Sequence, residues 1–282
     1  MRANLAQMKF DISKVKTKKK SVKIKALRTP LNMERELENF NKFMVKTIAK
    51  RFENQVLKKL DKKTVAKFSD ASVGNYAIIV ERLFRAFIKG INLQFSEKRI
   101  RKYIKNLYAR TNNLNDKTLY RNIEKVIGID VKSIIKTDGL NTFANAKSLE
   151  TSIQIIKLKK DTKSALTQNT LRLMSASKSL DTLYDEVKKT KFKHIKKSEL
   201  VARNELKTFN QQLNDKRAKN LGVKKAIWKT VSDERTRPCH RARANKEFDI
   251  KKGLYSSCDG LTISPGSEVN CRCYSEYIVN FD

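Results

Sequence analysis

The sequence contains little glycine or proline and no long hydrophobic run. Its 282 residues include 8 Gly and 3 Pro, which argues against a loop-rich β-sandwich, a collagen or a low-complexity protein. The longest wholly aliphatic run is Ala77–Val80, whereas a membrane-spanning helix needs about 20 apolar residues. The basic N-terminus has no apolar stretch typical of a signal peptide, so we expect a protein kept in the cytoplasm, with no membrane partner. These absences favour a protein of long helices.

Acidic residues are scarce beside basic ones. The 63 Lys and Arg exceed the 29 Asp and Glu and give a net charge of +34. A chain with this excess usually meets a polyanion, so nucleic acid is the first partner to consider. Residues 1–30 hold ten basic residues and one acid, whereas residues 198–282 hold sixteen basic and eleven acidic residues. The excess is therefore concentrated in residues 1–197.

The first thirty residues are predicted to form a disordered basic arm that binds double-stranded DNA without reading its sequence. The alternative for any single lysine cluster is a solvated face with no ligand. The nucleic-acid-binding candidates in the arm are Lys14, Lys16, Lys18, Lys19, Lys20, Lys23 and Lys25.

Apolar residues recur every three or four positions through the middle of the chain, which is typical of amphipathic helices. We expect helices over 37–60, over 76–108 with a break or close crossing at Gly90, and over 171–187. A further helix is predicted from an N-cap at Ser198 to Gly222, which suits the position just after a helix end.

After Gly222 the sequence changes to β-prone segments separated by turns. The predicted fold class is α+β: a mainly α-helical N-terminal and middle region followed by a small α+β C-terminal domain with short strands. Because cysteine, tryptophan and most of the proline fall near the C-terminus, we place a boundary near 190–198. The expected division is a basic arm (1–30), a basic helical region (31–197) and a C-terminal domain (198–282).

All four cysteines lie in the last 44 residues, together with one of the two histidines. Cys271 and Cys273, two positions apart on a strand, would point to one face. With His240 and Cys258 they would form a Cys3His set suited to a structural zinc ion. Cys239 would face away from His240 on a strand and is the weaker ligand. The spacing lacks paired C-x2-C knuckles, so buried thiols or an oxidised pair remain alternatives; a cytoplasmic protein favours reduced cysteines.

Asp233, Arg235 and Arg237 alternate and would share one face of an extended segment. They would form either an arginine–carboxylate clamp for a partner or a salt-bridged brace for the strand that carries Trp228. Trp228 itself is expected in the core.

Evidence for catalysis is weak. The zinc deaminase pattern H-x-E…P-C-x-x-C is absent, because Ala242 stands where the glutamate would be. No glycine-rich phosphate loop occurs. Cys239 or Cys271 as a nucleophile would need His240 as a base, and the sequence shows nothing that orients it. We therefore predict that the protein is not an enzyme.

Two segments, WKTVSDERTRPCHRARANKEF and LTISPGSEVNCRC, together with the preceding VARNELKTFNQQLNDKRAKNLGV, resemble the Mu F-like family of phage minor head (head morphogenesis) proteins. The chain departs from the family pattern at Ala244-Asn245, where Asp-Gly is usual; asparagine tolerates the left-handed conformation that such a turn needs. The matching residues are Arg203, Asn204, Gly222, Trp228, Asp233, Arg235, Arg237, His240, Pro265, Gly266, Asn270, Cys271, Arg272 and Cys273.

The resemblance implies a phage minor head protein that works with the portal and the capsid or scaffold proteins during procapsid assembly. It would be assembled in the host cytoplasm and lie inside the capsid near the portal vertex, beside packaged DNA. Alternatives are a zinc-ribbon-like nucleic-acid-binding regulator, which would show sequence preference, and a toxin-like hydrolase, which would depend on His240. The docking residues implied by the resemblance are Arg203, Trp228, Asp233, Arg235, Arg237, Asn270 and Arg272.

Overall fold

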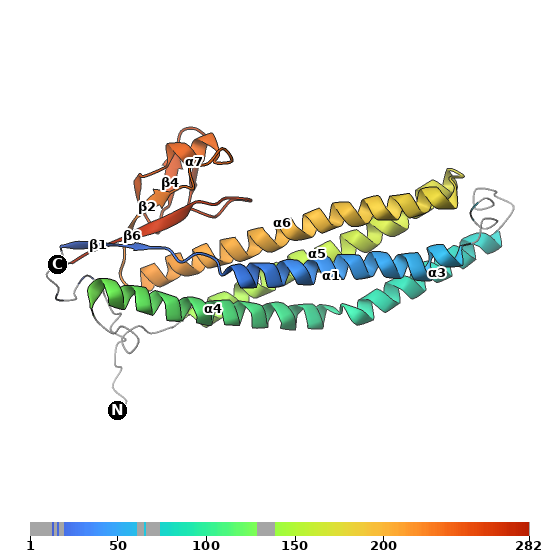
Figure 1. The fold of residues 1–282 in the computed structure, drawn as a ribbon, viewed down its shortest axis with the longest axis horizontal. Coiled ribbons are helices and arrows are strands. Elements are labelled where there is room, and N and C mark those ends of the chain that lie inside the picture. The colour runs from blue at the N-terminus through green and yellow to red at the C-terminus, as the bar shows by residue number, and fades with distance from the viewer. Residues whose placement is uncertain are drawn as a thin grey trace, which may run out of the picture. The chain divides into compact units, whose positions relative to one another are not determined.

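The computed structural model describes residues 20–60, 74–128 and 139–281, together with Ser13, Lys16 and Val65. It has the predicted α+β class, with long helices and a small antiparallel sheet region near the C-terminus (Figure 1). None of the described helices combines the length with the low charge content that crossing a membrane requires. In chain order the elements are β1 (Ser21–Lys25), α1 (Leu31–Gln55), the 3-10 turn η2 (Leu57–Lys59), α3 (Gly74–Gln94), α4 (Glu97–Ile127), α5 (Leu140–Ser175), α6 (Leu180–Asn220), β2 (Lys225–Lys229), α7 (Pro238–Ala242), β3 (Glu247–Asp249), β4 (Leu254–Ser256), β5 (Leu261–Ile263) and β6 (Tyr274–Asn280).

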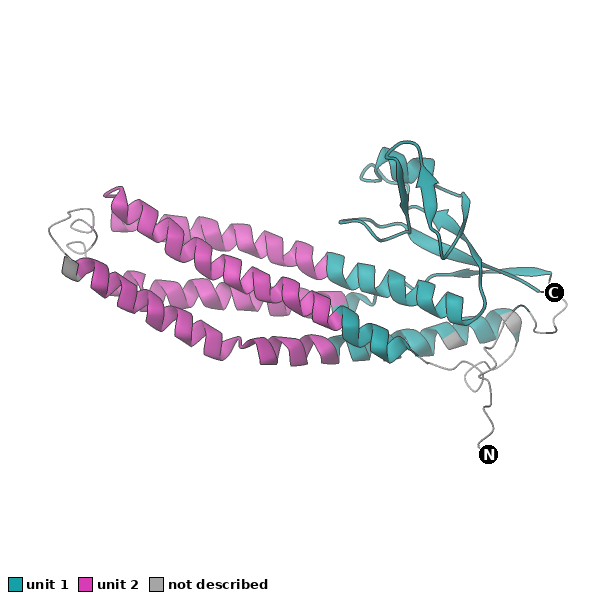
Figure 2. Ribbon diagram, turned by 180° about the vertical axis from the view of Figure 1, so that it is seen from behind, with its two compact units in different colours: residues 1–33, 107–147, 204–282 teal, residues 34–106, 148–203 magenta. Residues whose placement is uncertain are grey.

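The chain divides into two compact units, each assembled from separated stretches of sequence (Figure 2). Unit 1 comprises residues 1–33, 107–147 and 204–282, and unit 2 comprises 34–106 and 148–203. Helices α4, α5 and α6 each contribute residues to both units. The expected division into consecutive domains at 197/198 therefore differs from the units found, because α6 continues unbroken through that position.

Helix α6 begins earlier than predicted and ends where predicted. Its N-cap is Ser179, whose Oγ accepts a hydrogen bond from the Thr182 N–H at 3.3 Å. Ser198, the predicted N-cap, lies inside the helix, and its hydroxyl donates to the Ile195 carbonyl at 2.7 Å. At the other end Gly222 has φ 81°, and the Val223 N–H bonds back to the Ala218 carbonyl at 3.0 Å. This is the glycine-terminated helix end that was predicted.

Unit 2 is built from amphipathic helices packed along their apolar stripes. The Phe52 side chain of α1 is fully buried, and its ring meets that of Phe87 in α3 with centroids 5.1 Å apart. The predicted helix over 76–108 is two helices, α3 and α4. Ser96 separates them because its Oγ caps the N-terminus of α4 by accepting from the Arg99 N–H at 3.3 Å. Gly90 lies within α3 and does not interrupt it.

Unit 1 contains a four-stranded antiparallel sheet in the order β1-β6-β2-β3, and a separate hairpin of β4 and β5. β1 is an edge strand. Val22 and Ile24 are buried in the unit 1 core, whereas Lys23 and Lys25 are exposed. This corrects the prediction of a disordered arm through residue 30, because alternating apolar residues allow 21–25 to pair with β6. The earlier part of the predicted arm, with Lys14, Lys18 and Lys19, lies outside the described residues.

Polar contacts join helix α6 to the strands of unit 1. The side-chain amides of Asn210 and Asn214 both donate to the Leu27 carbonyl, at 2.6 and 2.8 Å. Asp215, which is 9% exposed, accepts hydrogen bonds from the Tyr277 hydroxyl at 2.6 Å and the Ser275 hydroxyl at 3.3 Å. Burial raises the pKa of Asp215, because the charged carboxylate loses its hydration.

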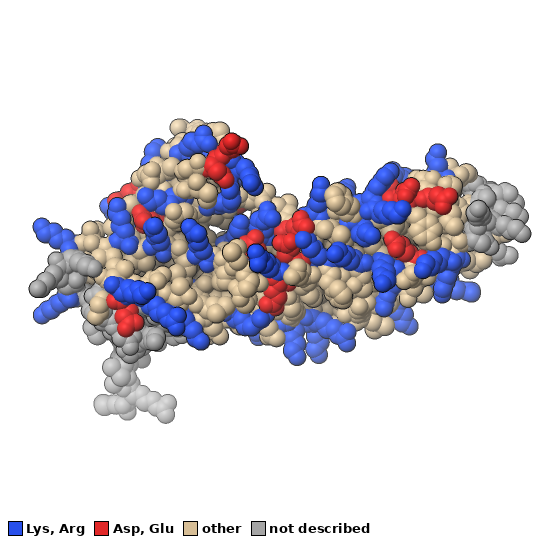
Figure 3. Space-filling model, in the orientation of Figure 1, with Lys and Arg blue, Asp and Glu red and all other residues tan. Residues whose placement is uncertain are grey.

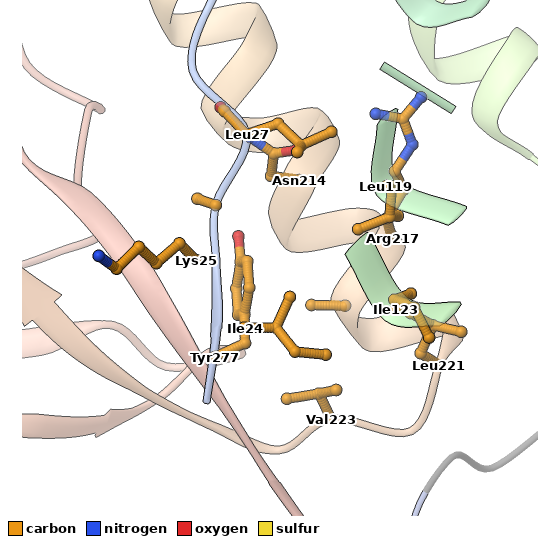
Figure 4. Close-up of a pocket in the computed structure, with 12 residues that line it drawn as sticks. Ile24, Lys25, Leu27, Leu119, Ile123, Asn214, Arg217, Leu221, Val223 and Tyr277 are labelled. Carbon is orange, nitrogen blue, oxygen red and sulfur yellow. The ribbon is translucent and has the colours of Figure 1, made fainter. Parts of the chain in front are cut away.

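A cavity of about 20 Å³ lies beside β1, α4 and α6 in unit 1. Figure 4 shows Ile24, Leu119, Ile123 and Tyr277 around it, with Arg217 nearby. This volume holds about one water molecule, whereas ligand pockets measure about 300–1,000 Å³. The cavity is therefore a packing gap and not a substrate site.

Candidate functional site

A loop before β6 carries much of the sequence resemblance and is held against α6. The Asn270 N–H donates to Asn204 Oδ1 at 2.9 Å, and the Thr208 hydroxyl donates to the Gly266 carbonyl at 3.3 Å. A Cβ at Gly266, where φ is 75°, would lie 3.0 Å from the Gln211 side chain. Glycine therefore permits both the turn and the close approach to α6.

The loop delivers two thiols to one histidine. Cys271 Sγ and Cys273 Sγ each lie 3.4 Å from His240 Nδ1. His240 is 3% exposed, and both cysteines are 7% exposed. Among the described residues, these ligand atoms all lie within 4.8 Å of one another. The structure therefore brings together three of the four predicted metal ligands.

Helix α7 aims His240 into this cluster. It begins at Pro238, which suits the first position of a helix because its missing N–H has no helical partner there. Adjacent residues on a helix point in different directions. His240 accordingly contacts the thiols and the Trp228 ring, whose centroid lies 5.8 Å away in an edge-on arrangement. Cys239 points elsewhere.

Cys258 is not part of the cluster. It forms a disulfide with Cys239, with their Cα atoms 5.3 Å apart. This corrects two expectations, namely that Cys258 would be the fourth ligand and that all four cysteines would stay reduced. The physical reason is that residues 238–242 are helical and not extended, which turns Cys239 toward the segment after β4. Cys271 and Cys273 remain free thiols.

A carboxylate orients the histidine from its other side. His240 Nε2 bonds to the Glu268 carboxylate, and Arg237 Nη1 holds the same carboxylate at 2.8 Å. Arg237 also donates to the Val269 carbonyl at 2.6 Å. Glu268 thus fixes the orientation of the imidazole ring and leaves Nδ1 directed at the thiols.

The pKa values of the two thiols shift in opposite directions because the thiols are hydrogen-bonded to each other. A hydrogen bond from Cys273 lowers the pKa of Cys271, and the Gly266 N–H adds a second donor at 3.3 Å. The pKa of Cys273 is raised for the converse reason, because its proton is held by Cys271. Cysteine sulfur and imidazole nitrogen are donor atoms that suit a zinc ion.

Asp233, the first residue of the D-x-R-x-R run, forms a brace with Arg272. Asp233 receives two hydrogen bonds from the Arg272 guanidinium, which lower the pKa of this carboxyl. The segment is a turn in which the Thr236 N–H donates to the Asp233 carbonyl at 3.0 Å. Because it is not extended, Asp233, Arg235 and Arg237 do not share one face as expected. Arg235 is exposed.

The remaining sequence candidates fall in separate places. Trp228 is fully buried in the unit 1 core, as expected. Arg203 lies on α6 in unit 2, with its Nε 3.6 Å from the Glu34 carboxylate. Asn245 has φ 62°, which confirms that asparagine supports the left-handed turn. Among the nucleic-acid-binding candidates, Lys16, Lys20, Lys23 and Lys25 are exposed.

Sequence reasoning missed Glu268 and Arg243. Glu268 stands three residues before Cys271, but only the fold places it on His240. Arg243 is fully buried and donates to both oxygens of Asp259 at 2.7 and 2.8 Å and to the Leu261 carbonyl at 2.8 Å. In a chain with so many exposed basic residues, nothing in the sequence distinguishes a buried one.

The sequence of the chain is similar to that of a known protein and to a family model. A protein of Haemophilus influenzae (strain ATCC 51907 / DSM 11121 / KW20 / Rd), named "Uncharacterized protein", is 23% identical over 246 residues, covering 86% of this chain and 54% of that protein. The chain thus spans about half of that relative's length. No solved structure matches the chain. The family model described as "Phage Mu protein F like protein" matches residues 77–276, from α3 to β6. The chain therefore belongs to the Phage Mu protein F like family.

Proposed function

We propose that this protein is a minor structural component of a phage head that works with the portal and capsid proteins during head assembly. We further propose that it binds packaged double-stranded DNA through phosphate contacts. Membership of a phage head family supports the first part, and the net charge of +34 supports the second. The protein acts as a structural component and not as an enzyme.

The observation that carries the DNA-binding proposal is a basic face on α6. Residues 188–197 contain six lysines and no acidic residue. Lys188, Lys189, Lys193 and Lys196 are exposed, while Val187 and His194 occupy the buried face. Figure 3 shows that basic side chains outnumber acidic ones on the visible surface, with acidic groups at intervals among them. Such a distribution suits contact with a phosphate backbone and not the reading of bases.

An exposed aromatic ring lies within this basic face. Phe192 is 61% exposed, and Lys196 Nζ lies 4.5 Å from the centre of its ring. This cation–π contact holds the Lys196 ammonium group near the surface of the helix. The positive charge of Lys196 therefore lies on a helix, and it adds to the charge of the lysines near the N-terminus.

A DNA titration against salt tests this proposal. Replacing Lys188, Lys189, Lys193 and Lys196 with Gln should weaken binding to a duplex of any sequence. It should also lower the slope of log K against log salt by about 0.9 for each phosphate contact removed. The measurement is fluorescence anisotropy with two duplexes of unrelated sequence.

The matched control removes the same charge elsewhere. Lys224, Lys246, Lys251 and Lys252 are exposed residues of unit 1, and their replacement with Gln should leave the slope nearly unchanged. An equal loss in both variants would show that only net charge matters and would contradict a specific binding face. A strong preference for one duplex would instead favour the regulator hypothesis.

The N-terminal lysines are tested by truncation before residue 20. The cut must spare β1, because the Phe281 N–H donates to the Lys20 carbonyl at 3.0 Å and the strand completes the sheet. We expect deletion of residues 2–19 to reduce the salt slope further. An unchanged slope would exclude the arm from DNA binding.

The docking surface for a head or portal protein is proposed on the loops around the Asp233–Arg272 pair. Val231 and Val269, on the two loops that carry this pair, are 51% and 60% exposed. In such an interface the two valines would supply apolar contact area, with the charged pair at its polar part. Replacing both valines with Asp should prevent copurification with the portal protein while the protein remains folded. If the variant still copurifies with the portal protein, the docking surface lies elsewhere.

A further inference from the structure

We propose that His240, Cys271 and Cys273 bind a zinc ion, with Glu268 as the second-sphere residue that positions the imidazole. This site differs from the set expected from the sequence, because Cys258 is bonded to Cys239. The inference is independent of DNA binding and of portal binding.

The distances fit a tetrahedral ion. Zinc–sulfur bonds of about 2.3 Å and zinc–nitrogen bonds of about 2.0–2.1 Å place neighbouring sulfur and nitrogen ligands about 3.6 Å apart. The two observed separations between His240 Nδ1 and the sulfur atoms are 3.4 Å. The two nitrogen–sulfur separations therefore differ from the expected value by only about 0.2 Å, and all three ligand atoms lie within 4.8 Å of one another. Three protein donors leave one position of a tetrahedral ion open.

The surroundings supply what a metal-bound histidine and thiolate require. A histidine ligand usually donates its other N–H to a carboxylate, which fixes the tautomer and the ring orientation. Glu268 occupies that position on Nε2 and is itself held by Arg237 at 2.8 Å. The Gly266 N–H donates to Cys271 Sγ at 3.3 Å, which stabilises negative charge on the sulfur.

The same residues also have the order of a nucleophile, base and orienting acid, so a reactive cysteine is the competing interpretation. Two observations favour the metal. Cys273 is as close to His240 Nδ1 as Cys271 is, whereas a nucleophilic site needs one thiol. Both thiols are only 7% exposed, which leaves little access for a substrate.

The experiment measures metal in the full chain, purified with a weak reductant and without chelator. Elemental analysis should find one zinc per chain. Replacing zinc with cobalt in the wild-type protein should give a thiolate-to-cobalt charge-transfer absorption, a signature that needs no variant to fold. Cys271→Ser and Cys273→Ser should each lose most of the metal.

The other two cysteines provide the matched control. The Cys239→Ser/Cys258→Ser double variant should keep one zinc and the cobalt signature. Glu268→Gln should weaken zinc affinity by about 10- to 100-fold in competition with a chromophoric chelator, as expected for a second-sphere residue.

Three results would overturn the proposal. The first is a folded wild-type protein that binds neither zinc nor cobalt. The second is metal that disappears with Cys239 and Cys258 but stays in Cys271→Ser. The third is rapid alkylation of Cys271 by iodoacetamide at the same rate with and without added zinc, which would establish a reactive thiol instead.

Discussion

Removing the Cys239–Cys258 disulfide tests how unit 1 is stabilised. The two cysteines are 19 residues apart, and the chain between them includes β3 and β4. Joining them reduces the conformational freedom of the unfolded chain. For a loop of this length the chain-entropy model gives about 3 kcal/mol at 25 °C. The Cys239→Ser/Cys258→Ser double variant should therefore lower the free energy of unfolding of unit 1 by about that amount.

The protein carries a built-in reporter for this measurement. Trp228 is its only tryptophan and is fully buried in unit 1. Its fluorescence during urea denaturation follows unit 1 without a contribution from tryptophan elsewhere. Wild-type protein treated with a strong reductant should lose about as much stability as the double variant, and the double variant should not respond to reductant.

Two results would refute the reasoning. If thiol titration finds four reactive cysteines in protein unfolded without reductant, the crosslink does not form. If the crosslink forms but its removal costs less than about 1 kcal/mol, the unfolded chain is already restricted over this loop, and the entropy model does not apply.

Three further predictions use the same fluorescence assay. Arg243→Lys should destabilise unit 1 by about 1.5–3 kcal/mol, because lysine keeps the charge but cannot replace the paired hydrogen bonds of the guanidinium; an unchanged midpoint would contradict its structural role. Because burial raises the pKa of Asp215 in the folded protein, its contribution favours folding at low pH and is lost as the pH rises through the folded-state value. Asp215→Asn should therefore remove part of the fall in stability as the pH rises above about 4, the usual pKa of an unfolded Asp, and an unaltered pH profile would argue against it. Ile24→Ala should cost about 2–5 kcal/mol because it removes a buried side chain of β1, whereas the exposed Lys23→Ala should cost little; equal effects would mean that β1 is not part of the core.

Much of the fold could be predicted from the sequence because local patterns determine it. The three- to four-residue apolar spacing identified α1 and the stretch that forms α3 and α4, and glycine after a helical stretch identified the end of α6 at Gly222. The spacing did not identify α5 (Leu140–Ser175), and the single helix predicted over 171–187 is wrong, because residues 176–179 separate α5 from α6. The first residue of a helix was harder to predict than its last residue. Ser198 and Ser179 both precede acidic residues and suit an N-cap, but Ser198 lies where the periodic pattern continues on both sides. A residue type that suits an N-cap is weaker evidence for a helix start than an apolar periodicity that continues on both sides is against one.

The pairing of distant segments could not be predicted. The sequence S-V-K-I-K alternates polar and apolar residues as a strand does. Because lysines are so frequent in and before it, the segment was instead predicted to be part of a disordered arm. Val22 and Ile24 become buried only because β6, more than 250 residues later in the chain, offers an edge for pairing. The disulfide was missed for a related reason, since the orientation of Cys239 depends on α7 being helical.

Two sequence runs carry the resemblance to the family. In the structure, side chains of the first run contact side chains of the second. From the first run, Asp233 pairs with Arg272, Arg237 holds Glu268, and His240 faces Cys271 and Cys273. The resemblance therefore identifies residues that join two loops, and most of these side chains are occupied by internal contacts. Val231, Arg235 and Val269 are among the residues that the joined loops leave exposed. Under the proposed docking function, the shared motif would stabilise a common framework, and these exposed positions would contact the partner.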